Sequence, residues 1–259
     1  ASDVYKRQVL EFHEYVNLFS GKSGSGKSTV MDAIQVILYG SFSPSFLNKA
    51  ADDAKNRRSV LSYLRGEQKD GSANRKDCDF CSVIALEIED TGTHIITCIG
   101  IAFEVRKSDS EIKKFVYFSH SGKMPESEYL TEQGVCYSNQ EIKKLVSART
   151  KSDDNRGKGE VNRIYGSKEA YLGTLYDVIL GYIDQNRFIT MEKSAIALKM
   201  TNGTGQFIRD YMFPKNTSNT IAAISEQLDS YRQIKDKIED LRKRIEILTD
   251  IQTSGQELV

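Results

Sequence analysis

The sequence predicts an α/β protein in which a strand, a glycine-rich loop and a helix are followed by an antiparallel meander. Residues 9–20 are rich in β-branched and aromatic side chains and run directly into the glycine-rich residues 21–26. Residues 28–39 then place apolar side chains at helical spacing and stop at Gly40. Three further strand-like runs follow at residues 82–89, 94–105 and 115–119. Because their connections are short, they predict an antiparallel meander.

Composition excludes several classes of protein. The chain has 259 residues, and 36 Lys and Arg balance 36 Asp and Glu, so bulk charge indicates neither nucleic-acid binding nor an acidic disordered tail. Hydrophobic residues make up 39% of the chain, which is enough for a core. No apolar run reaches the roughly 18 residues of a membrane-spanning helix, and residues 1–8 lack the apolar stretch of a secretory signal. We therefore expect a soluble, cytoplasmic protein without a membrane partner.

The four cysteines are too few for a disulfide scaffold and fit a reducing compartment. Cys78 and Cys81 form one CxxC pattern, but no second pair of ligands completes a zinc site. Two cysteines at the entry of a strand are the favoured interpretation over a zinc or redox site.

The other segments alternate polar loops with helices. Residues 41–81 predict a loop with a short helix near 60–64, and residues 139–147 predict another short helix. Residues 148–163 predict a polar, solvated loop rather than a nucleic-acid contact. Residues 168–183 return to helical spacing.

Near the end of the chain the sequence predicts one long, charged helix. Residues 221–251 contain no glycine or proline, 13 of them are charged, and their apolar side chains recur every three or four positions. An amphipathic helix packed on the rest of the protein is the alternative to a coiled coil. We expect an N-terminal lobe over residues 1–215 and the start of a coiled-coil arm over residues 216–259.

The glycine-rich loop carries the chemistry. Its sequence GKSGSGKS satisfies the phosphate-binding pattern GxxxxGK(S/T), or P-loop, between a predicted strand and a predicted helix. Glycines let successive backbone N–H groups point at phosphate oxygens, and the helix N-terminus adds its positive dipole end. The Lys27 ammonium, as the catalytic group, would bridge the β- and γ-phosphates, Ser28 would ligate Mg²⁺, and Thr29 would donate to the α-phosphate. ATP and Mg²⁺ are the expected ligands, bound by Gly21, Lys22, Ser23, Gly24, Ser25, Gly26, Lys27, Ser28 and Thr29.

A hydrolytic P-loop enzyme also needs an acidic residue at the end of a second buried strand. The acidic positions of residues 83–90 alternate with apolar ones, as in a meander strand with one wet face, and residues 178–184 have a helical pattern. Residues 202–206 (NGTGQ) only faintly match the LSGGQ loop of ABC-type ATPases, and a helix N-terminal turn is the better interpretation. The sequence thus contains phosphate-binding parts without visible hydrolytic parts.

In this order, the P-loop, antiparallel meander and outgoing charged helix resemble the N-terminal half of an SMC-type ABC ATPase head, as in SMC, Rad50/SbcC and MukB proteins. Residues 32–40 (DAIQVILYG), 46–67 and 80–90 are similar to the MukB-like ATPases (JetC) of bacterial Wadjet defence systems, and residues 195–230 resemble the neck of MukB-like heads. The resemblance covers roughly residues 9–251.

Two positions depart from the usual pattern of SMC heads. Ser23 stands where most SMC proteins carry Asn, and the Mg²⁺-sensing glutamine of ABC heads has only Gln185 as a weak counterpart. Residues 1–8 are unlike the start of these heads.

The resemblance implies an ATP-driven, DNA-loop-extruding complex in the bacterial cytoplasm, associated with the nucleoid. Hydrolysis would require the chain's own C-terminal half-head, which supplies the LSGGQ loop and the metal-binding Asp-Glu. The implied partners are a homodimeric copy through heads and hinge, DNA, kleisin and KITE subunits, and a Toprim-type nuclease. Lys55, Arg57 and Arg58 are candidate contacts to DNA phosphates or ATP, or else belong to a solvated basic turn.

Three alternatives stay open from the sequence. The first is a Rad50/SbcC-like or RecF-like DNA-repair ATPase with the same half-head. The second is a stand-alone P-loop kinase or GTPase, although residues 48–51 (NKAA) break the guanine-binding NKxD motif at its Asp. The third is a non-catalytic coiled-coil adaptor that binds nucleotide.

Overall fold

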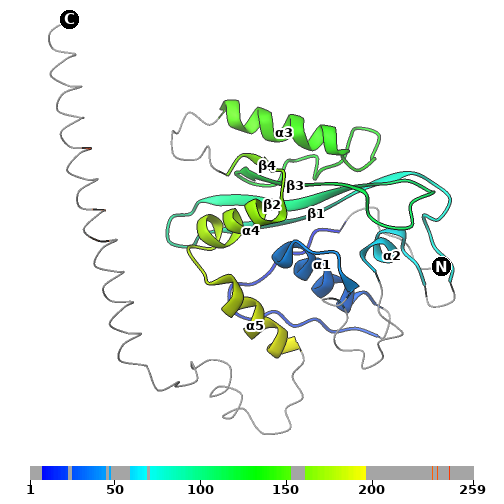
Figure 1. The fold of residues 1–259 in the computed structure, drawn as a ribbon, viewed down its shortest axis with the longest axis horizontal. Coiled ribbons are helices and arrows are strands. Elements are labelled where there is room, and N and C mark those ends of the chain that lie inside the picture. The colour runs from blue at the N-terminus through cyan, green and yellow to red at the C-terminus, as the bar shows by residue number, and fades with distance from the viewer. Residues whose placement is uncertain are drawn as a thin grey trace, which may run out of the picture. The chain divides into compact units, whose positions relative to one another are not determined.

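The computed structural model describes residues 8–22, 25–44, 47, 59–68, 71–152 and 161–196, together with residues 235, 238 and 245. The chain divides into two compact units, Ala1–Leu198 and Lys199–Val259. The first unit holds a single described sheet with helices on both of its faces (Figure 1). Among the described residues no helix is long and apolar enough to cross a membrane.

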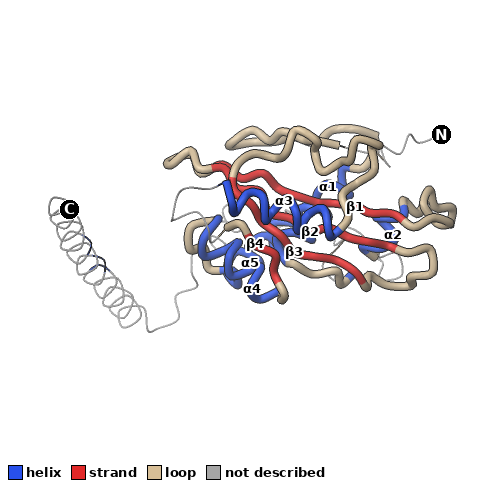
Figure 2. Tube along the Cα trace, turned by 90° about the horizontal axis from the view of Figure 1, so that it is seen from above, coloured by secondary structure: helices blue, strands red, loops and turns tan. Residues whose placement is uncertain are grey.

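The sheet is an antiparallel meander, as the sequence predicts. Its strands β1 (Phe80–Glu89), β2 (Ile96–Val105), β3 (Lys114–Ser121) and β4 (Arg163–Tyr165) lie in the order β1-β2-β3-β4. The first three run side by side over most of their length (Figure 2). The three-residue strand β4 begins at the last residue of the predicted loop 148–163, and the sequence does not predict it, because three residues are too few to show a periodic pattern.

Central strand β2 divides its side chains between two cores. Ile99, Ile101 and Phe103 point to one face, where they pack with side chains of α1 (Lys27–Tyr39), α2 (Val60–Arg65) and α4 (Lys168–Gly173). Ala102 points to the other face, where α3 (Asn139–Ser152) covers the sheet (Figure 1). Because both faces are covered, β2 is buried along nearly its whole length.

The helix predictions are mostly confirmed. Helices α1 and α2 lie where the spacing places them, and α3 continues to residue 152 instead of ending at 147. The helix predicted over residues 168–183 is shorter: α4 passes into a π-helical turn, η3 (Thr174–Ile179), and the chain turns at Gly181, which has a φ of 75°. A further helix, α5 (Gln185–Ile196), follows.

The prediction of a buried strand over residues 9–20 is wrong. No described residue of this segment has strand conformation, and its large apolar side chains are exposed, with Leu18 at 90% and Val16 at 78%. A strand requires a neighbour for its backbone N–H and C=O groups, and the described sheet pairs none of its strands with this segment. Composition predicts the tendency to form a strand, but the partner decides whether one forms.

The buried His120 of β3 binds Tyr129 of the following loop on the α3 face of the sheet. The Nδ1 of His120 is 3.0 Å from the Ser121 carbonyl oxygen, so Nδ1 carries the proton, and Nε2 accepts from the Tyr129 hydroxyl at 2.9 Å. Burial lowers the pKa of His120 below its ordinary value of 6.5, although the hydrogen bond to the Ser121 carbonyl raises it in part. The neutral ring thus holds Tyr129, whose own φ is 58°, against β3.

Little of the second unit is described. Lys235, Ile238 and Ile245 are helical, and the two isoleucines are 47% and 62% exposed. The other residues of the predicted arm, and the expected boundary near residue 215, lie outside the described residues.

Candidate functional site: the phosphate-binding loop

The predicted loop leads directly into α1, as its motif requires. The Lys27 ammonium lies inside the loop and donates to the carbonyl oxygens of Gly21 at 2.7 Å and Lys22 at 2.9 Å, and to the Ser25 hydroxyl at 3.2 Å. The Ser25 N–H donates to the Lys22 carbonyl at 3.2 Å and closes a turn. The loop backbone therefore already wraps around a cationic group.

Two positions of the loop favour glycine for different reasons. A Cβ on Gly21 would lie 2.7 Å from the Ser25 hydroxyl oxygen, so a side chain there would fill the space that the loop encloses. Gly26 has open space around its Cβ position, but its φ of 88° is one that other residues rarely adopt. Both conditions favour the glycine-rich pattern of the motif.

The N-terminus of α1 has the electrostatics of an anion site. Its N-cap, Gly26, offers no side-chain acceptor to the first amides, and the first turn contains no acidic residue. Ser28 and Thr29 are exposed in that turn. The first-turn N–H groups and the positive dipole end of the helix therefore lie beside Lys27, the arrangement of an anion-binding helix N-terminus.

These residues fit the phosphates of ATP and an associated Mg²⁺. The fit is visible in the loop itself: it encloses the ammonium of Lys27, a Cβ at Gly21 would obstruct it, and its helix N-terminus is uncapped. Lys27 would hold the β- and γ-phosphates, and the Ser28 hydroxyl would ligate Mg²⁺. The predicted residues Ser23 and Gly24 lie outside the described residues.

Two polar contacts that the sequence did not indicate hold the middle of α1. Asp32 is buried, and its carboxylate accepts a 2.5 Å hydrogen bond from the Tyr63 hydroxyl of α2. Gln35 is buried as well, and its side-chain amide donates to the Glu192 carboxylate of α5 at 2.9 Å. Both residues follow Lys27 closely in the sequence, but nothing in a single sequence reveals their distant partners.

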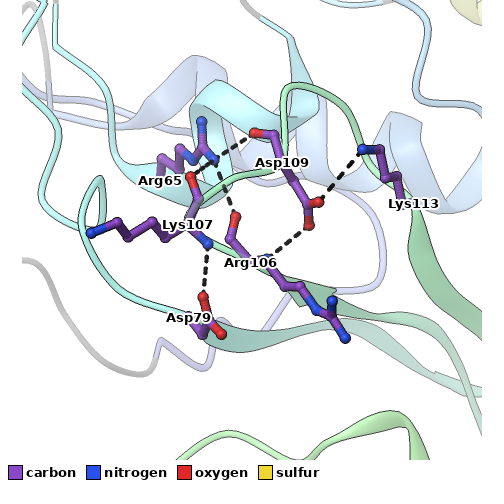
Figure 3. Close-up of polar contacts among 6 residues, drawn as sticks. All are labelled: Arg65, Asp79, Arg106, Lys107, Asp109 and Lys113. Carbon is purple, nitrogen blue, oxygen red and sulfur yellow. Dashed lines mark hydrogen bonds and ion pairs between the residues drawn. The ribbon is translucent and has the colours of Figure 1, made fainter.

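The Arg65 guanidinium of α2 binds the turn between β2 and β3. Its Nη2 donates to the carbonyl oxygens of Arg106 at 3.3 Å, Lys107 at 3.2 Å and Asp109 at 2.6 Å (Figure 3). The Asp109 carboxylate accepts from the Arg106 N–H at 2.8 Å and lies 3.8 Å from the Lys113 ammonium. Helix α2 therefore bridges the helix of the phosphate loop and this turn.

The acidic candidates from the sequence have structural roles. The Glu87 carboxylate accepts from the Met124 N–H at 2.7 Å, and the Asp184 carboxylate accepts from the Arg187 N–H at 2.8 Å in the first turn of α5. Neither stands at the end of a second parallel strand, since the described sheet is antiparallel. Gln185, the weak candidate for Mg²⁺ sensing, begins α5.

Of the remaining candidate residues from the sequence, the two cysteines lie among the described residues and the others do not. Cys81 lies in β1 and Cys78 just before it, and no group of three or more metal-ligating side chains exists among the described residues. Burial raises the pKa of the Cys81 thiol to about 11, which keeps it protonated. Lys55, Arg57 and Arg58, and residues 202–206, lie outside the described residues.

A glycine-rich loop that encloses a lysine at the start of a helix, within a mixed α/β fold, is typical of a P-loop nucleotide-binding protein. A family model described as an AAA domain matches residues 4–258, and the chain belongs to this family of SMC/Rad50-like AAA ATPases. Membership of the family implies ATP binding, with Mg²⁺ as the usual metal. Neither the comparison with curated proteins nor that with solved structures gives a match.

Proposed function

We propose that this chain supplies the ATP-binding half of an SMC-like head, and that a separate polypeptide segment completes the head. Exposure of residues 9–19 is the observation that carries the proposal. Their large apolar side chains are well exposed immediately before the phosphate loop, at Val9, Leu10, Phe12, Tyr15, Val16, Leu18 and Phe19. Full burial of an exposed side chain of this size contributes about 1.5–3 kcal/mol, and these side chains, at 38–90% exposed, would each contribute a corresponding part of it. Together they make this segment a candidate site for association.

The phosphate loop itself supports the same proposal. P-loop folds set the loop between a strand of a parallel sheet and a helix, whereas the described sheet that packs with α1 is an antiparallel meander. A complementary segment that brought parallel strands to residues 9–19 would bury their side chains and give the loop its usual setting. The same segment would supply the acidic residue and the LSGGQ loop needed for hydrolysis.

Within the SMC/Rad50-like family we propose a MukB-like ATPase of the Wadjet type, on the similarity of residues 32–40, 46–67 and 80–90. In that role the ATPase would act as a homodimer in the cytoplasm, near the nucleoid, and extrude DNA loops. Kleisin and KITE subunits and a Toprim-type nuclease would be its partners. The alternative proposal is a Rad50-like ATPase of DNA repair, since the family includes Rad50-like as well as SMC-like ATPases.

The decisive experiment replaces Leu18, the most exposed of these side chains, by glutamate. Because Leu18 is exposed in this chain, Leu18→Glu should change the melting temperature by no more than about 2 °C. In the intact protein, however, it should reduce ATP hydrolysis at least about tenfold, because a charge cannot enter the completed interface. Val135→Glu, at an exposed apolar position elsewhere, is the matched control. Wild-type hydrolysis by Leu18→Glu would overturn the proposal.

A further inference from the structure

Three tyrosine hydroxyls meet at the C-terminal end of α1, the helix that begins at the phosphate loop. The Tyr171 hydroxyl of α4 donates to the Ile37 carbonyl at 3.0 Å, and the Tyr176 hydroxyl of η3 donates to the Leu38 carbonyl at 3.0 Å. From β3, the Tyr117 hydroxyl donates to the Gly40 carbonyl at 2.6 Å. The last carbonyls of a helix lack the partner that continues its hydrogen-bond pattern, so the tyrosine hydroxyls supply donors where the helix supplies few.

The three donors are fixed in place by burial. The exposed fractions of Tyr171, Tyr176 and Tyr117 are 0%, 1% and 5%. Tyr117 stacks on Tyr171 with their ring centroids 4.6 Å apart, and Tyr165 meets Tyr171 edge to face at 5.7 Å. Burial raises the pKa of Tyr117 and Tyr176 to about 12, so both hydroxyls remain protonated donors at neutral pH.

The backbone at this end of α1 is fitted closely to the tyrosines. Gly40 has a φ of 52°, and a Cβ there would lie 3.3 Å from the Tyr171 ring and 3.5 Å from the Leu172 side chain. The Gly40 N–H also closes the helix on the Ile37 carbonyl at 3.3 Å. Two distant parts of the chain, strand β3 and the continuous segment α4–η3, therefore hold one helix end.

The two ends of α1 contrast sharply. The loop before Lys27 is largely exposed, and the bonds of the Lys27 ammonium all stay within the loop, whereas the C-terminal end is bonded to β3, α4 and η3. Because α1 has 13 residues and is about 20 Å long, it behaves as a short rigid rod. The bonds at its C-terminal end, together with those of Asp32 and Gln35 in its middle, therefore set the position of its N-terminal end. A displacement of about 1 Å at a phosphate site is enough to weaken its hydrogen bonds.

We propose that Tyr117, Tyr171 and Tyr176 are positioning residues of the nucleotide site, which anchor α1 by its C-terminal carbonyls and thereby place Lys27 and the first-turn amides for the phosphates. The inference rests on nucleotide binding by the Lys27 loop. None of the three touches the phosphate loop in the described contacts; they act through α1.

The test is the triple variant Tyr117→Phe, Tyr171→Phe and Tyr176→Phe in the full-length protein, with a fluorescent ATP analogue and Mg²⁺ as the probe. The rings remain, so packing is kept and only the three hydroxyls are lost. The matched control is Tyr129→Phe with Tyr165→Phe, since these buried tyrosines bond His120 and Ser119 and not α1. Melting temperature is measured on each protein, and amide hydrogen exchange on residues 27–40.

The triple variant should raise Kd about three- to tenfold and speed the exchange of α1 amides, since each neutral hydrogen bond contributes only modestly. The control should lose thermal stability at unchanged Kd. If triple variant and control lower the melting temperature but neither changes Kd, the tyrosines are merely structural and the inference is overturned. If the wild-type protein binds no nucleotide, the proposed function itself fails, which is a distinct result.

Discussion

Gly100 lies at the middle of β2, opposite Ala85 of β1 and Phe118 of β3, and it cannot accept a side chain. A Cβ at Gly100 would lie 2.4 Å from the Ile84 carbonyl oxygen and 2.9 Å from Ala85, where contacts below 3.0 Å essentially never occur. The obstructing atoms are backbone and cannot rotate away, so β1 and β2 must separate. We expect Gly100→Ala to cost about 3 kcal/mol, at the upper end for overpacking.

For a unit of this size, that loss lowers the melting temperature by about 6–12 °C, which circular dichroism can follow. The matched control is Gly166→Ala, because a Cβ at Gly166 meets no atom within 4 Å and the residue is exposed. The control should melt within about 2 °C of the wild type. If Gly100→Ala melts with the control, the close pairing of β1 with β2 at Gly100 is wrong.

Two further predictions concern the α3 face of the sheet and the turn between β2 and β3. Burial lowers the pKa of His120, so the unfolded chain binds more protons than the folded one just below pH 6.5, and stability must fall as the pH falls through that window. His120→Gln should therefore show a smaller decrease in melting temperature between about pH 7.5 and 5.5; an unchanged decrease would exclude His120 as its source. Arg65→Met keeps the apolar stem but removes the donor to three carbonyls, and should cost about 1–3 kcal/mol in urea unfolding, whereas the neighbouring Lys107→Met should cost under about 0.5 kcal/mol. Equal costs would show that the guanidinium contacts are unimportant.

Local periodicity was sufficient for much of the fold. The helical spacing of residues 28–39 predicts α1, and the alternating runs between 82 and 119 predict the meander, since each depends on neighbours close in sequence. The segment 9–20 was predicted wrongly for the opposite reason: a strand depends on a partner that its own residues do not specify. The π-helical turn at 174–179 likewise arises from packing, where the Leu180 N–H reaches back to the Leu175 carbonyl.

For the candidate site too, the sequence predicts what depends on residues close in sequence and misses what depends on distant ones. The phosphate motif is a continuous segment, so the sequence alone identifies Gly21, Gly26 and Lys27. The partners that support α1 from other elements lie up to 157 positions away in the sequence, as the bond between Gln35 and Glu192 of α5 illustrates. No periodicity within a single chain signals such pairs.

Nucleotide binding by the Lys27 loop is tested most directly by equilibrium binding of a labelled ATP analogue with Mg²⁺ to the wild type and to Lys27→Ala. The ammonium would make charge-assisted bonds to two phosphates, so its loss should raise Kd about 100-fold. Lys143→Ala, which removes an exposed ammonium of α3, should leave Kd within about twofold. Wild-type affinity in Lys27→Ala would contradict the assignment of the loop at residues 21–28 as the nucleotide site.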